Sequence, residues 1–145
     1  MESAREAGLA DRIDTLEGRF EDIPLPDASV DVVISNGVLN LAVDKLKAIN
    51  EIYRVLVPGG RLYLADVFLG KDLKETERLN ANLWAGCVGG ALLEGELIDI
   101  AGKTGFQSCR IVERFDCFQG SRVEGVVSST VEVHGANFFA QKPSI

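Results

Sequence analysis

The sequence predicts an α/β fold, in which strands and helices alternate. A β-branched run at 30–35 (VDVVIS), an amphipathic stretch at 44–56 and a second strand-like run at 61–67 (RLYLADV) follow one another within about 38 residues. That length is typical of a strand–helix–strand unit, whose crossover is right-handed in about 98% of cases. Two further strand candidates, 106–115 and 131–142, form an antiparallel-looking pair near the end of the chain. We therefore expect a sheet whose first strand pair is parallel.

The region before the first strand predicts only short elements. Glu2 to Ala7 is expected to form a helical stub that Gly8 closes, and Ile13 to Arg19 is a candidate short strand. The two prolines of IPLPD (23–27) impose a turn. The run at 30–35 is dense in β-branched residues. Such runs suit a strand covered on both faces, so we expect it to be central in its sheet.

The stretch from Asp44 to Leu56 is predicted to be helical from the spacing of its apolar residues. Leu46, Ile49 and Ile52 recur at helical spacing. Asp44 favours the positive N-terminal end of a helix, and the PGG sequence at 58–60 stops it.

The second half of the chain predicts two more helices. Lys71 to Asn82 is charged and expected to be helical, Leu83 to Leu93 is apolar but interrupted by three glycines, and Glu94 to Lys103 is another helix candidate. A polar, glycine-containing connection separates the last two strands. With 145 residues and no internal repeat or linker, the chain is expected to be one domain, 1–145.

Composition excludes several classes of protein. The chain is 46% hydrophobic and 26% charged, as in soluble globular proteins, and its net charge of −7 repels nucleic acid. The apolar stretch 83–93 is well short of the roughly 20 residues that cross a bilayer. Three cysteines without metal-site spacing, and an acidic N-terminus unlike a signal peptide, predict a reduced, cytoplasmic location without a bound metal.

Five segments carry a resemblance to a known family. FEDIPLPDASVDVVISN (20–36), EIYRVLVPGGRLYLADV (51–67) and AGKTGFQSCRIVE (101–113) resemble, in this order, the second half of class I S-adenosylmethionine-dependent methyltransferases. SNGVLNL (35–41) and LWAGCVGGAL (83–92) are similar to segments of the arsenite methyltransferase type. The resemblance implies a Rossmann-like three-layer (α-β-α) sheet, a last strand inserted antiparallel to its neighbour, and S-adenosylmethionine as cofactor.

The same resemblance implies that the fold is incomplete. In the family, a glycine-rich turn after the first strand approaches the cofactor closely, and an acidic residue that ends the second strand holds the ribose. None of the fifteen glycines of this chain are two positions apart, so no G-x-G is present. The matching residues begin near the helix after the second strand. We therefore expect a sheet that lacks the first two strands, and weak or absent cofactor binding.

Four residues are implied as the remaining cofactor contacts. Phe20 and Glu21 match a segment that lines the adenine in many relatives, although Arg19, which can only donate hydrogen bonds, stands at the usual acidic position. An exposed turn would also explain them. Asn36 and Gly37 follow the first strand at its carboxyl end, where open α/β sheets bind ligands. A tight strand-to-helix connection is the alternative for this pair.

Trp84 and Cys87 are implied as substrate-binding residues. Soft thiolates suit trivalent arsenic, and Cys87 matches one cysteine of the family, but Gly37 stands where another would be. One thiol forms no chelating set, so a packing role for Cys87 is the alternative. Trp84 either packs its segment onto the sheet or lines a small-molecule pocket.

The other chemically interesting residues have structural explanations. Cys109 and Cys117 are expected in the core, and His134, the only histidine, is expected within the last strand. Asp66 resembles a position at the mouth of the active site in relatives, and is also compatible with a solvated strand end.

Two functional hypotheses follow. The first is the substrate-side half of an arsenite methyltransferase-type enzyme, inactive alone. Either a partner chain supplies the glycine-rich half, or the chain is a fragment. The second is a non-catalytic small-molecule-binding or oligomerisation module. Without the first strand, 30–35 becomes an apolar edge that lacks lysine or proline. Either Ile13 to Arg19 pairs with that edge, or a second copy covers it, and we predict a homodimer through residues 1–40.

Overall fold

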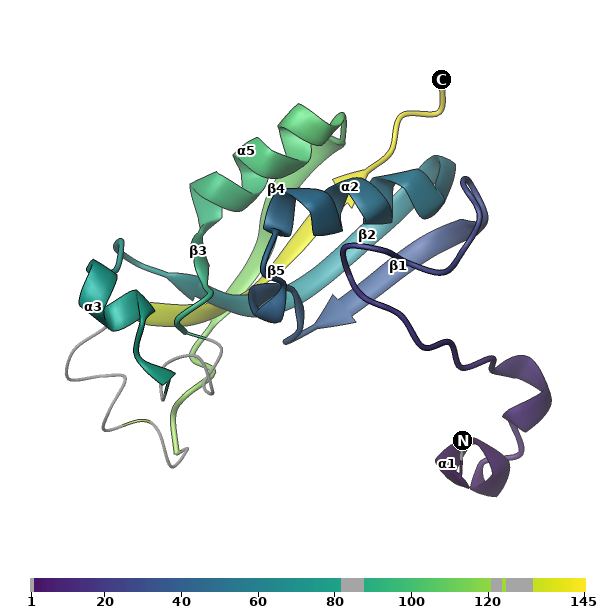
Figure 1. The fold of residues 1–145 in the computed structure, drawn as a ribbon, viewed down its shortest axis with the longest axis horizontal. Helices are drawn as coiled ribbons and strands as arrows, with labels where there is room; N and C mark the ends of the chain where they lie inside the picture. The colour runs from purple at the N-terminus through teal and green to yellow at the C-terminus, as the bar shows by residue number, and fades with distance from the viewer. Residues whose placement is uncertain (1, 82–87, 121–123, 125–131) are drawn as a thin grey trace.

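The computed structural model describes residues 2–81, 88–120, 124 and 132–145, which form one mixed sheet with helices packed against it (Figure 1). The strands are β1 (Val30–Asn36), β2 (Leu56–Leu69), β3 (Leu92–Leu93), β4 (Gln107–Phe115) and β5 (Val133–Gln141). The helices are α1 (Glu2–Glu6), α2 (Lys45–Val55), α3 (Glu75–Arg78) and α5 (Glu94–Thr104), with 3-10 turns η1 (Ala10–Arg12) and η2 (Leu39–Leu41).

The sheet has the order β1-β2-β5-β4. β1 runs parallel to β2, with Val33 opposite Leu62, whereas β5 lies antiparallel between β2 and β4. Both orientations were predicted and are confirmed. The short β3 pairs with β2 at Phe68 and Leu69, beyond the point where β1 ends. β1 is therefore an edge strand of the described sheet and not a central one.

Helix α2 begins and ends with side-chain caps. The Asp44 carboxylate accepts a hydrogen bond from the Lys47 N–H at 2.9 Å, as an N-cap does. At the other end, Lys142 Nζ donates to the carbonyls of Tyr53 (2.8 Å) and Leu56 (2.7 Å). A cation at the negative end of a helix stabilises it, so the last residues after β5 fix the end of α2.

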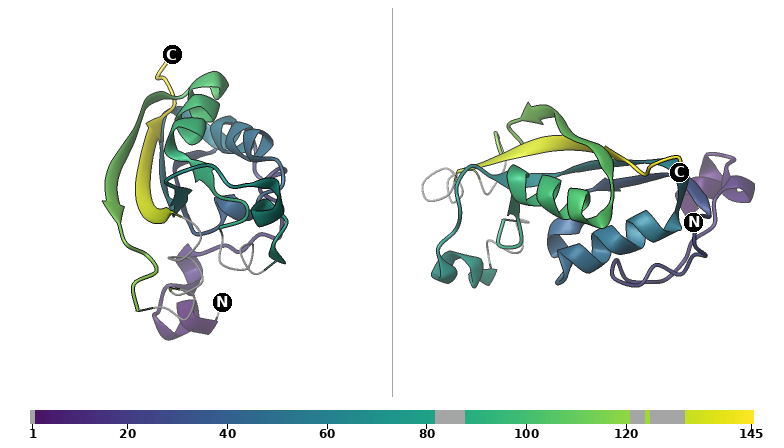
Figure 2. Two further views of the ribbon diagram at one scale, coloured as in Figure 1. Left: turned by 90° about the vertical axis from the view of Figure 1, so that its left-hand side faces the viewer. Right: turned by 90° about the horizontal axis from the view of Figure 1, so that it is seen from above.

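The core lies between the sheet and the two long helices. Helix α2 buries one apolar face, and α5 buries Leu97 and Ala101 before Gly105 ends it at a φ of +114°. Figure 2 shows α2 and α5 on the same side of the sheet. The strand side chains beneath them are almost fully buried: Leu62, Leu64, Phe68, Ala136, Phe138 and Ala140.

The other face of the sheet is uncovered among the described residues. Side chains alternate along a strand, so the neighbours of the buried ones point the opposite way. We call this surface the open face, and its members are Val32, Ile34, Tyr63, Val112 and Phe115, with the polar Arg110, Glu113 and Asn137. The third layer expected of a complete methyltransferase sheet is absent from the part of the chain that the structure describes.

Two local predictions were wrong, and a third gave a strand that is too short. Residues 13–18 form no strand, since only an isolated bridge between Arg19 and Asp22 follows them. The helix predicted from Lys71 shortens to Glu75–Arg78, and none of these four residues is buried. The strand predicted at 61–67 begins earlier, at Leu56, since β1 already pairs there and a register shift accommodates Pro58.

The burial of Phe138 gives a test of this core. Phe138 is 1% exposed beneath the helices, so Phe138→Ala should lower the free energy of unfolding by about 3–5 kcal/mol. Leu79 is 78% exposed, and Leu79→Ala should change stability by less than about 0.5 kcal/mol. Urea unfolding followed by circular dichroism measures both. Equal effects of the two substitutions would show that the core has been assigned wrongly.

Candidate functional site

The carboxyl ends of the parallel strands β1 and β2 form the candidate site. β1 ends at Asn36, and the chain turns at Gly37, whose N–H donates to the Ala65 carbonyl at 2.8 Å. Gly37 has a φ of +69°, a conformation that other residues adopt only with strain. The turn directs residues 38–44 across the end of the sheet, which is where open α/β sheets bind ligands.

A buried Asn–Asp pair holds the middle of this connection. The Asp66 carboxylate accepts from Asn40 Nδ2 at 2.9 Å, from the Asn40 N–H at 3.2 Å and from the Val67 N–H at 2.8 Å. Asn40 Nδ2 also donates to the Val67 carbonyl at 2.7 Å. Both side chains are buried, and burial raises the pKa of Asp66 although these hydrogen bonds lower it. Asp66 thus fastens the loop to β2 and is not a solvated strand end.

Lys45, the first residue of α2, binds the backbone of the same connection. Its Nζ donates to the carbonyls of Asn40 (3.2 Å) and Ala42 (2.8 Å). Burial lowers the pKa of Lys45, and the nearby Asp66 acts in the opposite direction. A lysine and an aspartate therefore hold η2 from two sides.

A small depression of about 160 Å³ opens beside this pair. Asn36, Gly37 and Asp66 line it, together with Cys117 and Phe118. Its volume is below the roughly 300–1,000 Å³ of small-molecule sites, so it is too small to enclose a whole ligand of that kind. Burial raises the pKa of the Cys117 thiol, which keeps the thiol protonated and weakens it as a nucleophile. Cys117 borders this depression and is half-buried, whereas the sequence placed it in the core.

The predicted adenine segment lies at a second depression. It is about 350 Å³ and is lined by Arg19, Glu21, Asp22, Asp44 and Lys47. Glu21 Oε1 accepts from the N–H groups of Val43 (3.0 Å) and Asp44 (3.5 Å). Backbone N–H groups, first its own, hold the pKa of Glu21 below its usual range. Phe20 packs against the core, so its ring faces inward.

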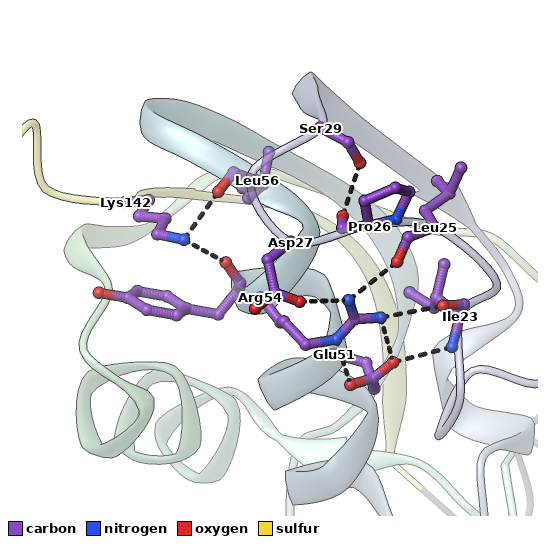
Figure 3. A network of polar contacts seen from close by, with 10 residues as sticks. Ile23, Leu25, Pro26, Asp27, Ser29, Glu51, Arg54, Leu56 and Lys142 are labelled. Carbon is purple, nitrogen blue, oxygen red and sulfur yellow. Dashed lines mark hydrogen bonds and ion pairs between the residues drawn. The ribbon is translucent and has the colours of Figure 1, made fainter.

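An ion-pair network fixes the IPLPD turn (23–27), which directly follows the residues that line this depression (Figure 3). Arg54 donates to Glu51 through Nε (2.8 Å) and Nη2 (2.8 Å), and to the carbonyls of Ile23 (2.9 Å) and Leu25 (2.8 Å). It also pairs with Asp27 at 2.7 Å, and Glu51 Oε2 accepts from the Ile23 N–H at 2.9 Å. This planar cation ties the IPLPD turn to α2, and so positions the residues just before it.

The structure brings some of the predicted site residues together and not others. Asn36 and Gly37 share one depression, while Glu21 lies at the other, and the 38–44 connection joins the two. Trp84 and Cys87 lie outside the described residues. Sequence reasoning missed Asn40, whose signal was a single amide between two leucines after a strand. It also missed the Glu51–Arg54 pair, whose signal was the i, i+3 spacing.

The remaining candidates have structural roles. Cys109 is half-buried in β4 and packs against the core, as predicted. His134 lies in β5, as predicted, with Nε2 at 2.7 Å from Glu94 Oε1 and its ring stacked near Phe68. Arg114 also binds that carboxylate, at 2.7 Å and 2.8 Å. Within the described ranges, no three His, Cys, Asp or Glu side chains are grouped as metal ligands, and no helix is long and apolar enough to span a membrane.

Comparison with known sequences identifies relatives of this chain. The profile of a methyltransferase domain family matches residues 1–64. Mouse arsenite methyltransferase is 41% identical over 106 residues, which are 71% of this chain and 28% of the mouse protein. The arsenite methyltransferase of Aquipseudomonas alcaligenes is 40% identical over 66% of this chain and 29% of its own length. The alignments thus span less than a third of each of these relatives.

Comparison with solved structures agrees. An arsenic(III) S-adenosylmethionine methyltransferase from Chlamydomonas reinhardtii superposes with a TM-score of 0.74 at 32% identity, over 87% of this chain and 43% of that one. A putative sarcosine dimethylglycine methyltransferase from Galdieria sulphuraria gives 0.75 at 20% identity over 99% of this chain and 64% of its own, a likeness of fold alone. The predicted resemblance to arsenite methyltransferase-like, S-adenosylmethionine-dependent methyltransferases and the predicted Rossmann-like fold are confirmed.

The Glu51–Arg54 network predicts a specific dependence of stability on pH. The hydrogen bonds from Arg54 lower the pKa of Glu51 to about 2, so the carboxylate stabilises the fold above its ordinary pKa of 4.5. That stabilisation should be lost as the pH falls from about 4.5 towards 2. Glu51→Gln should unfold more easily at pH 7, by about 1.5–3 kcal/mol, and lose less stability over that pH range.

Urea unfolding at several pH values measures this difference. Glu2→Gln, in a helix with no buried residue, removes the same charge and is the control. An identical pH dependence for Glu51→Gln and the unsubstituted protein would contradict the assigned network.

Proposed function

We propose that this chain, a homologue of arsenite methyltransferases over part of its length, supplies the substrate-side half of a methyltransferase fold that lacks the first two strands. One observation carries the proposal: β1, which the family resemblance makes an interior strand, has a described partner only in β2. The turn at Gly37 and the Asn40–Asp66 pair are nevertheless formed at the carboxyl ends of β1 and β2. One side of a ligand site is therefore built.

The described residues do not by themselves fit S-adenosylmethionine. The chain has no G-x-G turn, which in the family brings backbone close to the cofactor. The depression at Asn36 and Gly37 is small, at about 160 Å³. The Glu21 carboxylate is already bound by the backbone of residues 43 and 44. Asn36 and Gly37 are thus proposed to border one end of a cofactor whose other contacts come from elsewhere.

Methyl transfer depends on aligning the acceptor with the methyl donor, so one wall of the site gives little rate enhancement alone. We propose that the isolated chain is inactive and that a partner bearing the glycine-rich half would complete the site.

For the location of the protein, we propose a reduced, cytoplasmic compartment. The free thiols of Cys109 and Cys117 are compatible with it.

A second candidate function is a non-catalytic binding or oligomerisation module. The open face favours it, because an apolar sheet surface without a helical layer suits association with another protein. The two candidates differ in their response to a glycine-rich partner, which only the first requires.

Calorimetric titration with S-adenosylmethionine tests the first proposal. A micromolar dissociation constant corresponds to about 8 kcal/mol, which the contacts at Asn36 and Gly37 are too few to supply. We expect the isolated chain to bind more weakly than about 100 μM, a binding free energy of only about 5.5 kcal/mol. The Chlamydomonas relative, titrated under the same conditions, is the control. A dissociation constant in the low micromolar range for this chain would disprove the proposal.

Trivalent arsenic gives an independent test. Cys87 is proposed as a lone thiol, and single thiols do not chelate, so we expect weak arsenite binding. No methylated product should form when S-adenosylmethionine is added. Cys87→Ser is compared with Cys117→Ser, and mass spectrometry detects any product. Tight binding that only Cys87→Ser abolishes, or a methylarsenical from the isolated chain, would contradict this expectation.

A further inference from the structure

The open face carries several exposed apolar side chains close together. Ile34 is 78% exposed and Val112 is 61% exposed, although both lie within strands of a sheet whose other face packs against the core. Tyr63 and Phe115, each 41% exposed, extend the same surface over β2 and β4. Contiguous apolar patches larger than a few hundred Å² are rare on monomeric soluble proteins and mark interaction sites.

The open face is hollowed along its middle. A shallow groove of about 360 Å³ runs over β1, β2, β5 and β4, and its walls include Ile34, Tyr63, Val112 and Asn137. Apolar side chains of a second protein could interdigitate there, as the inner faces of two packed sheets do.

The charges on this surface allow two identical copies to meet. The chain carries a net charge of −7, so most of its surfaces repel a second copy. On the open face, Arg110 lies 4.3 Å from the centre of the Phe139 ring, and Glu113 accepts from Asn137 Nδ2 at 3.2 Å. Arg61 lies on the same face, opposite Val32. Because this face carries charges of both signs and no excess of acidic groups, it adds little to the repulsion between two acidic copies.

The N-terminal residues form a second surface with exposed apolar side chains. Neither α1 nor η1 contains a buried residue, and this segment projects away from the sheet (Figure 1). Its apolar side chains are exposed: Leu9 by 42%, Ile13 by 40% and Leu16 by 60%. The segment makes no strand with β1, so the edge of β1 stays without a partner in the described residues.

We infer that a second copy of this chain covers the open face, in a two-fold homodimer to which the N-terminal segments contribute. Four strands about 4.8 Å apart, with about seven residues each at about 3.3 Å, present roughly 450 Å² per copy. Two copies therefore bury roughly 900 Å² through the sheets alone. The exposed residues 9–16 bring the total above the roughly 1,000 Å² of a specific interface. In a two-fold contact, the same surface of each copy faces the other, so the open face of one chain is covered by the open face of the second.

This inference goes beyond the proposed function. A partner with the glycine-rich half would compete with the second copy for the edge of β1 and the adjoining open face. The homodimer is then the state of the chain without that partner.

Sedimentation equilibrium of the full chain at about 50 μM tests the inference. The expected mass is twice the 15.7 kDa of one chain. Ile34→Lys places a charge in the centre of the contact and should weaken dimerisation at least 100-fold. Leu79→Lys, at a position that is equally exposed at 78% but lies outside the open face, should leave the dimer intact. Leu16→Asp should weaken the dimer by a smaller factor, since it acts through the N-terminal segment.

The oligomeric state of the unsubstituted chain and of its variants decides whether the inference holds. A monomer of the unsubstituted chain overturns the inference and leaves the open face to a different protein. A dimer that resists both Ile34→Lys and Tyr63→Glu overturns the choice of surface, as does a dimer that Leu79→Lys disrupts equally. Circular dichroism of each variant identifies unfolding, and Tyr63→Glu replaces Ile34→Lys if the latter does not fold. Failure of cofactor binding does not affect this measurement, so the two proposals are tested separately.

Discussion

Both long helices pack on one face of the sheet, and this packing determines which strand residues are buried and which are exposed. Strand side chains alternate in direction, so each buried leucine of β2 beneath α2 and α5 leaves a neighbour on the other side. Leu62 and Leu64 are buried, whereas Tyr63 between them is 41% exposed. The same alternation exposes Ile34 on β1. A layer that hides one half of the apolar strand residues therefore creates the open face from the other half.

The candidate site follows from the same arrangement. α2 crosses from the end of β1 to the start of β2, so the residues before α2 must pass over the carboxyl ends of both strands. Gly37 makes that passage possible, and Asp66 anchors it through Asn40. Glu21 holds its far end through the backbone of residues 43 and 44. These contacts are all made within the chain, so the connection over the carboxyl ends of β1 and β2 is held in place by described residues alone.

The sequence predicted the elements whose apolar residues have a clear period. α2, α5 and the parallel pair β1 and β2 lie where their patterns indicate, and Gly37 and Asn36 meet at the expected end of the sheet. Charged or sparsely apolar segments were predicted less well: Ile13 to Arg19 has too few apolar residues to hold a strand. The Asn40–Asp66 contact depends on a tertiary distance that a periodicity does not contain, and so do the bonds from Arg54 to the carbonyls of residues 23 and 25. Asp66 in particular looks like a solvated acid until its burial is known.

The proposed function makes this chain one part of a site that a glycine-rich first half would complete. The most direct test is calorimetric titration of S-adenosylmethionine into an equimolar mixture of this chain and a polypeptide carrying the glycine-rich first half of an arsenite methyltransferase relative. We expect the mixture to bind at least 10-fold more tightly than either component, and the homodimer to separate as the complex forms. Equal affinity of the mixture and of its tighter component, without a heterodimer in sedimentation, would contradict the claim.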